Sequence, residues 1–147
     1  MKRFLWIIMV CLSAVGWVSC GDWIESSDNG RLDGNWFLIT IDTVGTGGSA
    51  DVTADRKFLA VQGSLLVVRD ADETVQYMFR FVHADGRLSL SDARVNAREH
   101  GDPLVTDVEL LRPFGINSLT ESFSVAFPNK NRMVLSGDML RLTFKRY

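Results

Sequence analysis

The two histidines are the side chains best suited to acid–base or metal chemistry, and they lie at His83 and His100. His83 alternates with aromatic residues along one apolar face, which is typical of a histidine in a core or at its rim. His100 lies in the polar stretch NAREHGD, between Glu99 and Asp102. Three such neighbours seldom converge on one ion without distant ligands. We therefore expect no metal site.

The sequence also lacks the patterns typical of covalent catalysis and of phosphate binding. No serine stands in a strained turn or beside a base, as Ser-His-Asp catalysis requires. The carboxylates of Asp70, Asp72 and Glu73 share a predicted turn in solvent, which does not favour acid–base catalysis by a carboxylate pair. The glycine-rich stretch 44–51 does not lead into a helix, so it makes no phosphate cradle. We expect a protein that is not an enzyme, with no catalytic residue and no cofactor.

The first 19 residues have the pattern of an export signal. Lys2 and Arg3 precede an apolar run over residues 4–18. This run suits a signal-peptide core and is shorter than the about 20 apolar residues that span a membrane. Without the two leader cations, 14 basic residues face 18 acidic ones. Because phosphate binding needs a concentrated basic footprint, we expect no nucleic-acid partner.

The apolar run ends in WVSC, where the small Ser19 directly precedes Cys20. This junction resembles the lipobox of bacterial lipoproteins, in which the cysteine is acylated and becomes the first residue of the mature chain. Acyl chains hold a protein on a bilayer without a transmembrane helix. The resemblance implies an exported protein that is lipid-anchored to the bacterial cell envelope, at the outer membrane. The alternative is an ordinary signal peptide cut nearby, which leaves a free thiol.

The chain divides into three parts on this interpretation: a signal peptide over 1–19, the lipidated cysteine with a flexible tether over 20–30, and one domain over 31–147. The tether, GDWIESSDNG after the cysteine, has too few apolar residues to offset the entropy of ordering. The domain contains no cysteine, so its stability must come from packing.

Alternating apolar residues dominate the domain, most clearly over 75–84, where Asp85-Gly86 then marks a two-residue hairpin turn. A short helix is predicted over 106–115. The pattern indicates an all-β fold, a small up-and-down antiparallel barrel of about eight strands with one short helix. The other predicted strands cover residues 35–42, 57–62, 64–69, 87–91, 121–127, 132–136 and 139–147.

The first predicted strand opens with Gly34-Asn35-Trp36. This triplet resembles the G-x-W signature of lipocalins, and with the lipobox it makes residues 31–147 resemble the lipocalin-like family of small bacterial lipoproteins. The resemblance implies that Gly34 and Trp36 form a plug at one barrel end and that an arginine of the last strand, Arg141 or Arg146, packs over the indole. The alternative is a tryptophan in the core of any β-protein.

An eight-stranded barrel is either filled by its side chains or holds one small ligand. We expect a small apolar ligand whose polar end lies near Thr40, Tyr77 or His83. The alternative is an accessory lipoprotein with a filled barrel that docks onto an envelope protein partner, through an outer apolar face made of Phe37, Ile39 and Ile41. The candidate ligand-binding residues are Thr40, Tyr77, Phe79, Phe81, His83 and Phe123.

Overall fold

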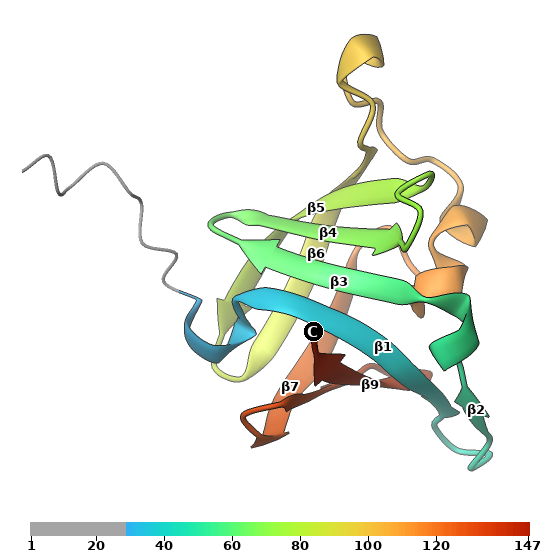
Figure 1. Ribbon diagram of the computed structural model, residues 1–147, viewed down its shortest axis with the longest axis vertical. Coiled ribbons are helices and arrows are strands. Elements are labelled where there is room, and N and C mark those ends of the chain that lie inside the picture. The colour runs from blue at the N-terminus through green and yellow to red at the C-terminus, as the bar shows by residue number, and fades with distance from the viewer. Residues whose placement is uncertain (1–28) are drawn as a thin grey trace, which may run out of the picture.

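The computed structural model describes residues 29–147, so Cys20, the signal peptide and most of the tether lie outside the described residues. The strands form one antiparallel sheet that closes through a pairing of its first and last strands, as Figure 1 shows. The strands are β1 (Gly34–Thr43), β2 (Ser49–Asp51), β3 (Lys57–Gln62), β4 (Leu65–Asp70), β5 (Gln76–Ala84), β6 (Arg87–Val95), β7 (Glu121–Asn129), β8 (Arg132–Ser136) and β9 (Leu140–Arg146).

The sheet has the up-and-down order that the sequence predicted. Each strand from β3 to β8 pairs with the next along the chain. The short β2 and the longer β3 pair with successive parts of β1, so together they fill one position of an eight-stranded barrel. The turn between β5 and β6 is the predicted hairpin, and both Asp85 and Gly86 have a positive φ, of 53° and 71°.

A bulge in β1 changes which of its residues face the core. The register with β9 shifts between Leu38 and Thr40, so that Thr40 pairs with Thr143 and Ile41 pairs with Leu142. Leu142 is buried and Ile41 packs against the core. Our prediction that Thr40 faces inward and Ile41 outward is therefore wrong, because one extra residue reverses the alternation along a strand.

Five short 3-10 helices supplement the barrel: η1 (Gly30–Leu32), η2 (Thr53–Asp55), η3 (Arg98–His100), η4 (Val108–Leu110) and η5 (Arg112–Phe114). The predicted short helix over 106–115 takes the form of η4 and η5, with the Asp107 carboxylate accepting from the N–H of Glu109 at 3.0 Å. The segment carrying η3 projects from the barrel at the top of Figure 1. No helix within residues 29–147 is both long and apolar enough to cross a membrane.

The core fills the barrel from end to end. Its members come from the inward face of every strand except β2, and no polar or charged residue of the described chain is buried with them. One barrel end is occupied by Trp36, and we call it the Trp36 end. The other is covered by residues 105–116, which we call the lid segment, and we call that end the lid end.

Candidate ligand-binding site

The Trp36 end is sealed by a single large side chain. The Trp36 side chain is fully buried, and its indole N–H donates to the backbone carbonyl of Leu32 at 2.9 Å. The ring of Phe127 packs against the indole with 6.0 Å between the ring centroids. The bonded N–H removes the cost of burying a polar atom, so the indole closes this end stably.

Arg146, at the end of β9, lies over the indole with its guanidinium carbon 4.3 Å from the ring centroid. The same guanidinium donates to the carbonyls of Arg31 at 3.0 Å, Asp33 at 3.1 Å and Lys130 at 3.3 Å. Gly34 has a φ of 119°, and a Cβ added to it would lie 2.8 Å from the Arg146 Nη1. Glycine at this position therefore gives room for the arginine that ties the two chain ends of the barrel together.

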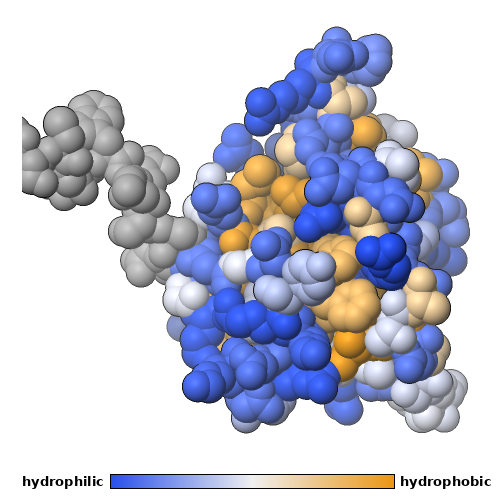
Figure 2. Space-filling model, in the orientation of Figure 1, coloured by the Kyte–Doolittle hydropathy of each residue, from blue (hydrophilic) through white to orange (hydrophobic). Residues whose placement is uncertain are grey.

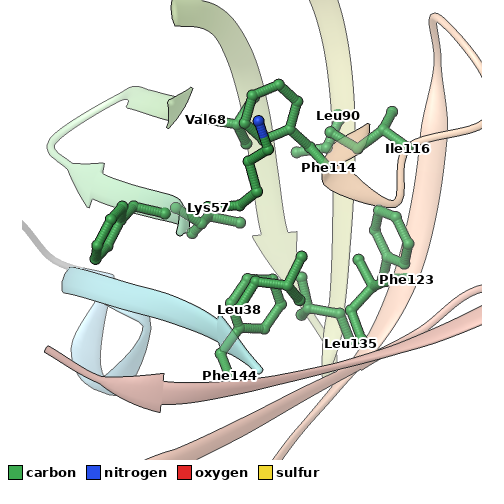
Figure 3. A pocket seen from close by; sticks show the side chains of 12 residues that line it. Leu38, Lys57, Val68, Leu90, Phe114, Ile116, Phe123, Leu135 and Phe144 are labelled. Atoms are coloured by element: carbon green, nitrogen blue, oxygen red, sulfur yellow. The ribbon is translucent and has the colours of Figure 1, made fainter. Parts of the chain in front are cut away.

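The barrel interior is nearly full. The cavity at its lid end has a volume of about 10 Å³, which is the least that holds a single water molecule. Its walls are apolar side chains from β1, β3, β4, β6 to β9 and the lid segment, shown in Figure 3. Lys57 is the one charged residue among the twelve that line it. In this conformation the interior has no room for an organic ligand.

The candidate ligand-binding residues do not form one cluster. Of the six, Phe123 alone lines the cavity. Phe79 is buried elsewhere in the core, Phe81 packs half-buried against it, and Thr40 lies on the outer face. Tyr77 lies at the lid end, where its ring contacts that of Phe114 at a centroid distance of 5.9 Å.

The two polar residues of β5 are divided between the barrel ends. His83 lies six residues beyond Tyr77, about 20 Å along the strand toward the Trp36 end. Tyr77 is buried, burial raises the pKa of its phenol, and the hydroxyl makes no hydrogen bond to any described residue. A single ligand head group therefore cannot use both residues, and the lid end has the one suited to a polar group.

Lys57 is the functional candidate that reasoning from the sequence missed. It lies in phase with Leu59 and Val61, which face the core, so its side chain starts on the inward face of β3. Its ammonium nitrogen lies over the Phe114 ring, 5.0 Å from the ring centroid, and Figure 3 shows the side chain reaching toward that ring. The two-residue period from Leu59 was the signal that could have revealed it.

The lid segment closes the lid end with buried apolar side chains. Those of Val105, Leu111, Phe114 and Ile116 are at most 6% exposed. Gly115, with a φ of 79°, lies so close to Leu142 that an added Cβ would overlap the leucine methyl groups. The lid segment therefore fills the mouth of the barrel with its own side chains.

The hydrogen bonds of the lid segment are local. Among the described residues, every backbone hydrogen bond that joins residues 107–116 is made within that stretch. Its attachments to strands lie at the two ends, where Val105 donates to the Ala93 carbonyl at 2.8 Å and the N–H of Asn117 donates to Glu121 Oε2 at 2.6 Å. Side-chain burial, and not shared backbone bonding, holds the middle of the lid in place.

Apolar side chains also gather on the outer face of β1, β3 and β4, as Figure 2 shows. The ring of Phe58 contacts Phe37 at 5.2 Å and Tyr147 at 5.0 Å between centroids. The guanidinium of Arg69 lies 5.0 Å from the Phe58 ring centroid. This outer face includes Phe37 of the expected patch, whereas Ile41 packs against the core.

The stretch around His100 brings no metal-binding group together. Within residues 29–147, no three His, Cys, Asp or Glu side chains are placed to hold an ion. Asp102 instead accepts from the backbone N–H of Ala97 at 2.9 Å, which shapes the η3 turn.

The comparisons with known proteins agree with this geometry. The family model of the lipocalin-like domain matches residues 11–147. The barrel is similar to a lipocalin-like protein from Bacteroides uniformis, at 17% identity and a TM-score of 0.60, with 80% of this chain and 100% of that chain covered. It is also similar to an uncharacterized protein from Bacteroides eggerthii, at 16% identity and a TM-score of 0.59, with 79% and 99% covered.

A protein from Burkholderia xenovorans is similar at 20% identity and a TM-score of 0.54, with 78% of this chain and 82% of that chain covered. At these identities the likeness to solved structures shows the fold alone. No curated protein matches the chain. Because the family model covers nearly its whole length and the barrel closes as the family's fold requires, the chain belongs to the lipocalin-like domain family.

Proposed function

We propose that this protein is a non-catalytic binding protein of the bacterial cell envelope, whose barrel takes up a small apolar ligand when the lid segment moves away. The observation that carries the proposal is the way the lid is held. Its middle is attached through the side chains of Leu111, Phe114 and Ile116, with no backbone bond to a strand among the described residues. The lid can therefore lift without breaking the sheet.

The cost of lifting the lid sets the size of the ligand. Exposing three buried side chains of this kind costs about 1.5–3 kcal/mol each, or roughly 5–9 kcal/mol together. A ligand recovers about 0.8 kcal/mol for each methylene group it buries. An apolar ligand with on the order of ten carbons, in a chain or in fused rings, is thus needed to offset the lid.

The closed lid also leaves one polar group unsatisfied. The side-chain nitrogen of Asn117, next to the buried Ile116, is buried without an acceptor among residues 29–147. An unpaired buried donor costs about 1–3 kcal/mol. The closed form therefore contains one unpaired buried donor, and this lowers the free energy needed to lift the lid.

The anchor part of the proposal rests on the lipobox-like sequence before Cys20. Acylation at Cys20 would place the barrel at a lipid bilayer on a short tether. We expect the chain to fractionate with membranes and the variant Cys20→Ser to appear in the soluble fraction. Mass spectrometry of the mature amino terminus gives the matching direct readout, and an unmodified cysteine there would contradict the anchor.

Ligand uptake is tested with a neutral apolar dye, N-phenylnaphthylamine, whose fluorescence rises in an apolar site. We expect weak binding to the purified wild-type protein and at least about tenfold tighter binding to Phe114→Ala, because a change of 1.4 kcal/mol in the lid cost is a factor of ten in affinity.

Phe127→Ala is the matched control, because it removes the same ring from the Trp36 end. We expect it to lower stability without raising dye affinity. If neither the wild-type protein nor Phe114→Ala binds the dye, ligand uptake is overturned. Equal gains in the two variants would exclude the lid end as the route.

A second candidate function is the docking of a filled barrel onto an envelope protein, and the exposed Tyr147 and the half-buried Phe37, both in contact with the buried Phe58, favour it. A pull-down from solubilised membranes separates the two functions. A stoichiometric protein that is lost with Tyr147→Ser supports docking, because Tyr147 is exposed and does not line the cavity, whereas a co-purifying small molecule supports ligand uptake.

A further inference from the structure

We propose that the ligand is an amphiphile with a single anionic head group, such as a long-chain carboxylate, and that Lys57 at the lid end selects it. This inference rests on the proposed ligand uptake and adds the chemistry of the ligand's polar end.

The charge of Lys57 is not paired with a carboxylate of the described residues. Lys57 starts on the inward face of β3 and lines the apolar cavity, where its ammonium contacts the face of the Phe114 ring. Within residues 29–147, no carboxylate lies within 4.0 Å of this ammonium, although four other ion pairs are formed there. A cation that lines an apolar cavity, contacts an aromatic ring and has no carboxylate within ion-pair distance among these residues is suited to receive an anion.

The carboxylate opposite Lys57 on the neighbouring strand is held by its own turn. Asp70 pairs with Lys57 across β3 and β4, but it accepts from the Thr74 hydroxyl at 2.7 Å and from the Val75 N–H at 3.3 Å. The Thr74 hydroxyl chiefly, and Lys57 to a smaller extent, hold the pKa of Asp70 below its usual value. Asp70 is thus engaged by its own turn and leaves the ammonium open to another anion.

The closed lid covers both polar residues of the lid end with one side chain. Phe114 contacts both the Lys57 ammonium and the Tyr77 ring. When the lid lifts, both groups lose this ring together. The Tyr77 hydroxyl has no hydrogen-bond partner among the described residues, so it can donate to a head group that the ammonium holds. The apolar residues below, such as Phe123 and Phe144, then face the ligand's chain.

The test compares palmitate with the neutral alcohol of the same chain length, by displacement of N-phenylnaphthylamine. We expect the wild-type protein to bind palmitate about tenfold to a hundredfold more tightly than the alcohol, the range expected for one charge-assisted hydrogen bond. Lys57→Met should bind the two equally, with affinity for the alcohol unchanged. Lys57→Arg should keep the preference because it keeps the charge.

Lys145→Met is the matched control, since Lys145 is an exposed lysine on β9 that does not line the cavity. It should keep the preference of the wild-type protein. Equal binding of palmitate and the alcohol by the wild-type protein would overturn the role of Lys57 and leave ligand uptake intact. A preference that survives in Lys57→Met would do the same. Binding of neither compound by the wild-type protein and Phe114→Ala would overturn both proposals.

Discussion

Replacing Arg146 with methionine should loosen the Trp36 end of the barrel. Methionine keeps an apolar stem over the indole but removes the guanidinium, which donates to three backbone carbonyls and covers the Trp36 ring. We count about 0.5 kcal/mol for each of these partly solvated hydrogen bonds and about 1 kcal/mol for the cation–π contact. The expected loss in the free energy of unfolding is therefore about 2.5 kcal/mol.

Urea denaturation followed by tryptophan fluorescence measures this loss. The matched control is Arg141→Met, because Arg141 is an exposed arginine near the other end of the same strand. We expect Arg141→Met to change stability by less than about 0.5 kcal/mol. A loss for Arg146→Met no larger than that of the control would refute the bracing role.

A double-mutant cycle with Gly34→Ala sharpens the test. The added Cβ meets both an unfavourable φ of 119° and the Arg146 Nη1 at 2.8 Å. In the Arg146→Met background the second obstacle is gone, and only the backbone strain of about 1–3 kcal/mol remains. The two losses should thus sum to more than the loss of the double variant, by about 1 kcal/mol. Strict additivity would show that the glycine and the arginine act independently.

Two further predictions concern residues elsewhere in the barrel. Burial raises the pKa of Glu121 despite the N–H groups of Asn117 and Ser118, so its stabilising contribution is full below its unfolded pKa of about 4.3 and is lost as pH rises through the folded pKa. The melting temperature of Glu121→Gln should therefore rise relative to that of the wild-type protein as the pH increases from about 4 to 7. A difference between the two melting temperatures that stays constant with pH would contradict this. Ile41→Ala should cost about 2 kcal/mol in urea denaturation and Thr40→Ala less than about 1 kcal/mol, because the bulge turns Ile41 to the core. The opposite order would mean that the bulge is absent in solution.

Local patterns in the sequence were enough to predict the barrel. Alternation over 75–84 and the Asp85-Gly86 turn depend on neighbouring residues only, and they set strand and hairpin correctly. Gly34 and Trp36 stand two apart at the start of β1, which was enough to expect the indole near a barrel end. The choice between Arg141 and Arg146 was left open, since it depends on where the last strand ends against the first.

The tertiary structure decided the candidate site. The bulge after Leu38 reversed the inward face of β1. Its extra residue is set by the pairing with β9 and cannot be recognised from the local sequence pattern. The lid segment fills the mouth because four of its side chains find apolar area on strands far away in the chain. Lys57 became a candidate only when Phe114, 57 residues later, was placed beside it. Periodicity in a sequence indicates which face a residue takes along an uninterrupted strand, whereas a bulge, and what each face meets, depend on contacts between distant segments.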